Sequence, residues 1–514
     1  MFNRRAFLLL LAVLIFLPAF VSADYLGQRV NFFIEPDFDS LGRSQISATL
    51  ERTSSHLYFY IEDNWWSSLT PIQRDGVYSA FNNLAFEFDS KIYPLLTSYF
   101  GSEWNPGIDN DQKITVLFHS MKTPAKGYFR NIDEYEKFQL PASNQREMVY
   151  LNAKNITDSL LKSYLAHEFT HLITFNQKDR LLNVSEDVWL NEGRSEFAIS
   201  LLGYNNVYEG SYLRSRVMSF LENPLDSLTE WQGQVYDYGI LNLFIHYLVD
   251  HYGIEILTES LHSEKVGIES INEALKNRGY SQDFSQIFTD WTITVLINDC
   301  KTSEKYCYYN QNLKALRIVP FNNFLPFSGQ STLSLTNTLK DWSVHWQKFS
   351  GGRGNLKIEF EGSKVASFKI PYITQDFSGN YSVGAFSLDK DQKGEIIVPG
   401  FGKEISSVTI IPSIQDKIAD FSSYEPSFAY YLTVSTFSQS KPKPETEPEQ
   451  EPVEEQEQEK QETVPGQEQT PQFQPKPGSL ESKLPFSVSK PLSEMTYREL
   501  LITLIKLFLH LRQT

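Results

Sequence analysis

Residues 167–196 read HEFTHLITFNQKDRLLNVSEDVWLNEGRSE, and the organisation of the chain follows from them. His167, Glu168 and His171 form an H-E-x-x-H pattern at the start of this stretch. Residues four apart lie on the same face of a helix, so both imidazoles can reach one metal ion. Glu168 points into the same space, beside a metal-bound water. The surrounding apolar residues recur at helical spacing, so we expect a helix that carries two metal ligands.

The H-E-x-x-H pattern alone does not establish a metal site. The chain has nine histidines, and an accidental match has a probability of roughly 1–2%. The pattern is also compatible with two partly buried histidines on an ordinary amphipathic helix. The interpretation therefore depends on the second half of the stretch.

Glu192 and Glu196 can complete a metal site. A catalytic zinc site needs three protein ligands and one open position. Ser185 is the expected N-cap of a second helix that ends at Gly203, which places both carboxylates on one face. One carboxylate can bind the metal while the other hydrogen-bonds the free nitrogen of a ligand histidine. Gly193, in the middle of this helix, predicts a close approach to another helix.

HEFTH followed by WLNEGRSEF resembles the gluzincin metallopeptidases, the thermolysin-like and aminopeptidase-N-like group. In that group a glutamate on a following helix is the third ligand, and an acid four residues later orients the first histidine. The resemblance implies one Zn²⁺ held by His167, His171 and Glu192, with Glu196 as the orienting acid. This core and the short aromatic motifs around it, within about residues 45–260, also resemble the hyicolysin-like secreted peptidases.

Two related peptidase classes fit less well. A metzincin would need Gly at position 174 and His at position 177, where this chain has Thr174 and Gln177. Aminopeptidase-N-like exopeptidases read the free amine of the substrate through a G-x-M-E-N stretch, and no such stretch precedes His167. We therefore expect an endopeptidase.

The resemblance implies an α+β zincin-like catalytic domain over residues 24–318, with a small mixed sheet over the active-site helix plus a helical subdomain. Alternating or apolar runs predict strands at 57–61, 113–119 and 147–152. In gluzincin-type folds the edge strand of the sheet pairs with the bound peptide, and the resemblance implies that role for the neighbourhood of residues 127–129. The sequence does not identify the edge strand.

Two other helices are predicted. Thr70 and Pro71 are the expected N-cap and first residue of a helix that runs to about Tyr93, where Pro94 should end or kink it. A second helix spans residues 234–253 and ends at a glycine.

Tyr236-Asp-Tyr-Gly239 is similar to the Y-x-K-G stretch of aminopeptidase-N-like gluzincins, where the tyrosine polarises the scissile carbonyl. We expect Tyr236 to stabilise the oxyanion, with Tyr238, which stands where the lysine would be, as the alternative. Both can also be ordinary packed aromatics. A thermolysin-type histidine donor would have to be His246 or His251, and we expect both to pack within a helix. In this scheme Glu168 is the general base for attack by a zinc-bound water and passes the proton to the leaving amine.

The remaining segments have distinct compositions. Residues 1–23 resemble a secretory signal that is cleaved, with an uncleaved anchor as the alternative. Short strand-like runs with frequent turns predict a β-sandwich over 319–440. The Pro/Glu/Gln tract 441–483 is expected to be a disordered spacer. Residues 484–514 are expected to form an amphipathic helix for a membrane surface or cell-envelope partner, with a helix that docks on its own protein or self-associates as the alternative. Cys300 and Cys307 suggest a small-loop disulfide in an exported protein, or two free thiols.

The formal net charge of −17 argues against nucleic-acid binding, which calls for a basic patch. We therefore expect a secreted or cell-surface zinc peptidase with a protein or peptide substrate. The alternative is a surface adhesion protein with a vestigial peptidase domain. The oligomeric state is not readable from the sequence.

Overall fold

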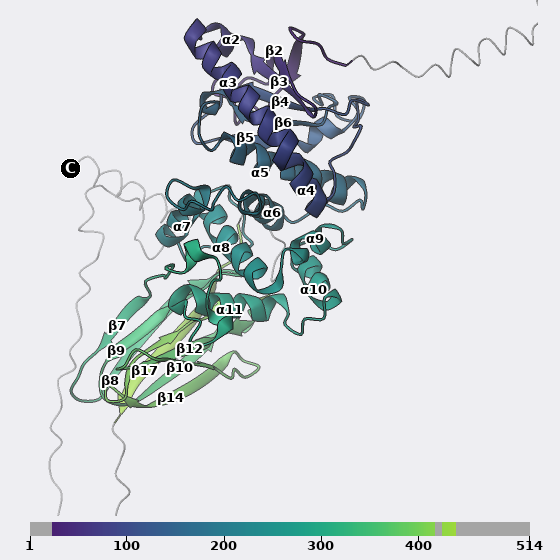
Figure 1. Ribbon diagram of the computed structural model, residues 1–514. Helices are drawn as coiled ribbons and strands as arrows, with labels where there is room; N and C mark the ends of the chain where they lie inside the picture. The colour runs from purple at the N-terminus through teal and green to yellow at the C-terminus, as the bar shows by residue number, and fades with distance from the viewer. Residues whose placement is uncertain (1–22, 417–423, 438–514) are drawn as a thin grey trace, which may run out of the picture. The chain divides into compact units, whose positions relative to one another are not determined.

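The computed structural model describes residues 23–416 and 424–437, which form helices together with mixed β-sheets (Figure 1). All of them belong to one compact unit, Met1–Lys441. Among these residues, every helix is too short or too polar to span a bilayer. The expected spacer and C-terminal helix lie outside the described residues, and so does the expected signal apart from its last residue, Ala23. These three segments stay predictions.

The N-terminal part contains a six-stranded sheet with the order β1-β2-β3-β4-β6-β5. The central strands β3, β4 and β6 are parallel and fully buried, as expected of strands covered on both faces. β5 pairs antiparallel with β6 and lies at the edge of this sheet. The strands are β1 (Arg29–Phe33), β2 (Gln45–Thr53), β3 (Leu57–Glu62), β4 (Ile114–His119), β5 (Gly127–Phe129) and β6 (Met148–Asn152).

Helix α3 (Pro71–Glu87) begins as predicted, with Thr70 in a capping box and Pro71 in the first turn. The prediction that Pro94 ends or kinks the helix near Tyr93 is wrong in position. The helix changes earlier, to a π-helical segment over Phe88–Ile92, and then continues as α4 (Tyr93–Phe100). Proline has no backbone N–H to donate, and the wider π-helical turn before Pro94 avoids the need for that hydrogen bond. The helix therefore continues through Pro94.

The helical part follows β6. Helix α5 is buried along nearly its whole length because it lies between the sheet and the other helices. The helices here are α5 (Leu161–Thr174), α6 (Val188–Leu201), α7 (Tyr212–Glu222), α8 (Val235–Tyr252), α9 (Glu255–Leu261), α10 (Gly267–Asn277) and α11 (Phe284–Ile297); the short α2 (Asp63–Ser67) follows β3.

The prediction that Ser185 caps the second helix is wrong. Helix α6 starts at Val188 with Asp187 at the N-cap position, and it ends two residues before Gly203. The Ser185 hydroxyl instead donates to Asp179 Oδ1 at 3.1 Å. A local side-chain partner therefore holds Ser185 outside the helix.

Two glycines allow close helix packing. A Cβ atom on Gly193 of α6 would lie 2.9 Å from Ile245 Cγ1 of α8, which confirms the predicted close approach. A Cβ atom on Gly239 of α8 would lie 2.7 Å from the backbone nitrogen of Phe220 in α7. Because this second neighbour is backbone, it cannot move without displacing α7.

We expect Gly239→Ala to lower the free energy of unfolding by about 1–3 kcal/mol, the usual cost of overpacking a core. Gly76→Ala is the matched control, since Gly76 lies in helix α3 and a Cβ atom there would meet nothing within 4 Å. This control should instead gain about 0.5–1 kcal/mol from helix propensity. Urea unfolding of both variants measures the difference, and equal stability of the two would contradict the close approach of α7 and α8.

The C-terminal part is β-rich, as the sequence predicts. Nine of its strands form one sheet, in which seven follow the path β13-β12-β15-β14-β10-β17-β8, β9 pairs with β15, and β7 pairs with β9. β14 and β15 pair only where Phe401 faces Ile405, and one hydrophobic core contains residues from the strands on both sides of that pair. This arrangement is typical of a sandwich. The strands are β7 (Phe321–Leu325), β8 (Ser331–Leu339), β9 (Gln347–Gly351), β10 (Gly354–Gly362), β12 (Pro371–Asp376), β13 (Tyr381–Ala385), β14 (Lys393–Phe401), β15 (Ile405–Ile410) and β17 (Phe428–Phe437), beside a separate pair, β11 (Phe368–Lys369) and β16 (Ser413–Ile414).

The helical and β-rich parts share a core. Trp342 and Trp346 belong to the same hydrophobic cluster as Trp291 of α11. The Trp346 Nε1 atom donates to the Thr292 carbonyl oxygen at 2.9 Å. Lys340 Nζ lies 2.7 Å from the buried carboxylate of Glu230, in the segment that leads into α8.

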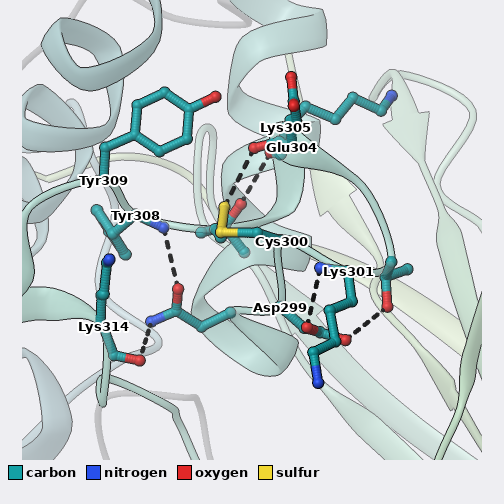
Figure 2. Close-up of a disulfide and its surroundings, with 12 residues drawn as sticks. Asp299, Cys300, Lys301, Glu304, Lys305, Tyr308, Tyr309 and Lys314 are labelled. Carbon is teal, nitrogen blue, oxygen red and sulfur yellow. Dashed lines mark hydrogen bonds between the residues drawn. A yellow bond between two sulfur atoms is a disulfide. The ribbon is translucent and has the colours of Figure 1, made fainter.

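Cys300 and Cys307 form a disulfide, which confirms the predicted pairing (Figure 2). The bridge closes the turn after α11. Figure 2 shows that Tyr308 lies beside it, where its backbone nitrogen donates to Asn298 Oδ1 at 3.0 Å. The disulfide therefore fixes a connection at the end of α11.

Candidate metal centre

Helix α5 places His167, Glu168 and His171 in the interior beneath the sheet. The exposed fractions of the three residues are 6%, 7% and 7%. They lie near β5, since a Cβ atom on Gly127 would meet Glu168 Oε1 at 2.8 Å. The absence of a side chain at Gly127 therefore leaves room for the carboxylate of Glu168 beside the sheet edge.

Glu192 of α6 faces the two histidines. His167 Nε2 lies 3.1 Å from Glu192 Oε2 and 3.1 Å from His171 Nε2, and His171 Nε2 lies 3.6 Å from Glu192 Oε2. The three side chains each offer one ligand atom to a common point. Among the described residues, this is the one group of three histidine, cysteine or acidic side chains close enough to hold a metal ion.

The outer nitrogen of each ring is directed at a polar neighbour. His171 Nδ1 lies 3.0 Å from Asn191 Oδ1 and 3.2 Å from Ser195 Oγ. Since the amide oxygen of Asn191 can only accept, Nδ1 carries the proton and Nε2 keeps its lone pair. His171 Nε2 and His167 Nε2 lie at hydrogen-bond distance from each other, and both face Glu192 Oε2. The donor set therefore fits a metal with imidazole and carboxylate ligands, such as zinc.

Glu196 lies behind His167. Its Oε1 atom is 3.5 Å from His167 Nδ1. Both carboxylate oxygens accept 2.8 Å hydrogen bonds from the Arg216 guanidinium, and Asn242 Nδ2 donates to Oε2 at 3.1 Å. A fully buried carboxylate held in this way can fix the orientation of the His167 ring.

The electrostatics of the cluster favour positive charge at its centre. Burial lowers the pKa of His171, but the Glu192 carboxylate outweighs burial and raises the pKa to about 9. Burial raises the pKa of Glu192, but the two imidazoles outweigh it and hold the pKa far below its usual range. Burial raises the pKa of Glu168; the charges of His167 and His171 oppose that rise, and the carboxylates of Glu192 and Glu196 add to it. A carboxyl group with a raised pKa is suited to accepting a proton.

Tyr238, rather than Tyr236, contacts the cluster. The ring centroid of Tyr238 lies 6.4 Å from that of His167, and the Arg216 guanidinium carbon lies 4.4 Å from the Tyr238 centroid. Burial and the charge of Glu192 raise the pKa of Tyr238 well above its usual value, so the phenol stays protonated and able to donate. Tyr236 is half-buried in the first turn of α8.

The two candidate histidine donors lie elsewhere, as expected. His246 Nε2 is 3.0 Å from Ser200 Oγ, and its ring packs on Phe197. His251 Nε2 is 2.9 Å from the carbonyl oxygen of Cys307. Both side chains are used in helix packing.

The structure brings together His167, Glu168, His171, Glu192 and Glu196 of the predicted site. It also adds four residues that the sequence analysis did not identify, namely Asn191, Ser195, Arg216 and Asn242. Asn191 and Ser195 both lie within the quoted stretch. Ser195 is one helical turn after Glu192, so the same helical spacing could have found it, whereas Asn191 is the immediate neighbour of Glu192 and the spacing does not mark it. Arg216 and Asn242 belong to α7 and α8, and no local pattern marks them.

Comparison with known proteins supports part of this interpretation. No family model matches the chain. The neutral metalloprotease ShpI of Staphylococcus hyicus is 33% identical over 129 residues, a match that covers 21% of this chain. The similarity supports a metalloprotease. The match covers only 28% of that relative's length.

Two solved structures resemble about a quarter of the chain. The pre-peptidase C-terminal domain of a Bacillus anthracis collagenase shares 12% identity, with 23% of this chain and 96% of that chain covered and a TM-score of 0.16. The lysozyme inhibitor PliG of Aeromonas hydrophila also shares 12% identity, with 23% and 98% covered and a TM-score of 0.16. Similarity at this level carries no argument about function.

Proposed function

We propose that this protein is a zinc-dependent endopeptidase that hydrolyses peptide bonds in extracellular proteins. The observation that carries the proposal is the convergence of His167 Nε2, His171 Nε2 and Glu192 Oε2 next to the buried carboxyl group of Glu168. The similarity to a neutral metalloprotease supports the same reaction class.

His167, His171 and Glu192 would hold the metal, and Glu196 would keep the His167 ring in place. A zinc ion supplies Lewis-acid chemistry, polarising the peptide carbonyl and making a water more acidic. Glu168 takes the proton from the attacking water and delivers it to the leaving amine. Tyr238 donates a hydrogen bond to the carbonyl oxygen as negative charge develops on it.

Strand β5 supports the assignment to peptide substrates. Its outer edge has no strand partner in the six-stranded sheet, and Gly127 lies beside Glu168. An extended peptide that pairs with such an edge uses its backbone rather than particular side chains. A substrate strand held on β5 would run past the general base, with chain extending on both sides of the scissile bond.

The test is cleavage of denatured casein by the purified protein, with and without a zinc chelator. We expect cleavage that the chelator abolishes and added zinc restores. Peptides blocked at both ends distinguish an endopeptidase from an aminopeptidase, because only the endopeptidase cleaves them. A protein that binds one zinc per chain but cleaves neither casein nor blocked peptides would contradict the proposal.

We expect Tyr238→Phe to lower kcat by about 10²–10³, the usual effect of removing one oxyanion donor, with KM nearly unchanged. Tyr236→Phe is the matched control and should stay within about twofold of the parent. Steady-state kinetics on a blocked fluorogenic peptide measure both constants. If Tyr236→Phe lowers kcat and Tyr238→Phe does not, Tyr236 is the oxyanion donor instead.

A further inference from the structure

Arg216 of α7 contacts residues of both α6 and α8 beside the candidate metal centre. Its Nε and Nη2 atoms each donate a 2.8 Å hydrogen bond to one carboxylate oxygen of Glu196, and Nη2 also donates to the Tyr212 hydroxyl at 2.6 Å. Only 11% of the Arg216 side chain is exposed. Two-point pairing with a carboxylate fixes the plane of the guanidinium, and the ammonium of a lysine cannot reproduce this geometry.

The Arg216 guanidinium also lies over two tyrosine rings. Its central carbon is 4.4 Å from the ring centroid of Tyr212 and 4.4 Å from that of Tyr238. A cation over an aromatic face is attracted by the ring, and more strongly where water is excluded. The guanidinium that Glu196 holds in place therefore holds the Tyr238 ring as well.

Ring contacts, rather than hydrogen bonds, hold Tyr238 in its position. The ring packs edge-on against Trp231, with centroids 4.9 Å apart, in addition to its contact with Arg216. No residue in the described part of the chain hydrogen-bonds the Tyr238 hydroxyl. The hydroxyl is therefore free to donate to a substrate, while its location depends on what lies against the ring.

We propose that Arg216 is a positioning residue that places both the Tyr238 hydroxyl and the acid behind His167 with one guanidinium. Glu196 Oε1 lies 3.5 Å from His167 Nδ1, so the Arg216–Glu196 pair stands behind a proposed metal ligand. A rotation of the guanidinium would move this carboxylate and the Tyr238 ring together. The inference rests on the proposed function and adds that one group outside the reacting atoms aligns the metal ligand with the oxyanion donor.

The test begins with Arg216→Lys in the whole protein at saturating zinc. Lysine keeps the positive charge beside Glu196 but loses the planar face and the two-point pairing. We expect kcat on a blocked peptide to fall about 10²-fold, the usual cost of a misplacement of about 1 Å, with KM nearly unchanged. Arg214→Lys, the same change at an exposed position of α7, is the control and should leave both constants unchanged.

A double-mutant cycle with Tyr238→Phe separates positioning from general damage. If Arg216 acts through Tyr238, adding Arg216→Lys to Tyr238→Phe should lower kcat by no more than about threefold further, because the donor that it places is already gone. Effects of the two changes that multiply in full would overturn the proposal.

A second measurement does not need turnover. In metal-free protein labelled with ¹³C at the tyrosine ζ carbon, the nuclear magnetic resonance signal of Tyr238 is the one that Tyr238→Phe removes. This signal should shift in Arg216→Lys and stay in place in Arg214→Lys. A shift in a protein whose parent cleaves no peptide would overturn the proposed function and support the placement of Tyr238 by Arg216. A parent that cleaves peptides, with an unshifted signal in Arg216→Lys, would overturn only the positioning role.

Tyr212→Leu keeps the test decisive if Arg216→Lys fails to fold. This change leaves the Arg216–Glu196 pair in place and removes one of the two rings beneath the guanidinium. We expect kcat to fall about tenfold, the effect of losing one shielded contact between a cation and a ring. Tyr208→Leu, the same change at a half-buried tyrosine before α7, is its control. Equal kcat in the two leucine variants would overturn the proposal.

Discussion

Glu168→Gln should lower kcat/KM for casein-derived peptides by at least about 10³-fold while the protein keeps one zinc per chain. Glutamine preserves the shape of the side chain but cannot take a proton from water, and general base catalysis contributes about 10²–10⁴-fold. Kinetics on a blocked peptide, together with zinc analysis of the same sample, measure both quantities.

The control is Glu264→Gln, the same chemical change at an exposed position. It should leave both turnover and zinc content unchanged. Loss of zinc from Glu168→Gln would show that Glu168 is also a ligand. Full activity of that variant would exclude it as the general base.

Glu192→Ala should remove zinc from the purified protein, with an affinity loss well beyond the 10–100-fold expected for a residue behind a ligand. The reason is geometric, since Glu192 Oε2 lies 3.1 Å from His167 Nε2 on the side where both ring nitrogens converge. Without this carboxylate, the site has two neutral ligands and too little negative charge. Titration against a zinc-selective fluorescent chelator measures the affinity.

Glu196→Gln is the comparison, because it keeps a side chain that can accept from Arg216 while removing the charge. It should lower zinc affinity by about 10–100-fold only. If Glu196→Gln loses zinc and Glu192→Ala retains it, the ligand and the orienting acid are reversed. Circular dichroism of both variants excludes unfolding as the cause.

Features that depend on short-range spacing were predictable from the sequence. The helix around His167 and His171, the strand at residues 57–61 and the disulfide follow from period, composition or cysteine spacing. The capping of α6 was not predictable, because Ser185 and Asp187 are both good capping residues. The hydrogen bond from Ser185 to Asp179 keeps Ser185 from the capping position that Asp187 takes, and this bond forms only in the folded chain.

Features that depend on packing were not predictable. Tyr236 and Tyr238 differ by about 200° around a helix axis, so the tyrosine that faces His167 depends on how α8 is rotated against its neighbours. Arg216 reaches Glu196 because Gly239 lets α7 approach α8 closely. Neither fact leaves a signal in the residues around H-E-x-x-H.

Trp342 and Trp346 determine where this chain can be divided. They lie beyond residue 318, the predicted domain boundary, yet their rings belong to the core around α11. A fragment ending at 318 would lose them and also Lys340, leaving the buried charge of Glu230 unpaired in the segment that leads into α8. The β-rich part therefore contributes to the core around α11, and we expect a fragment that ends at residue 318 to be less stable than the whole chain.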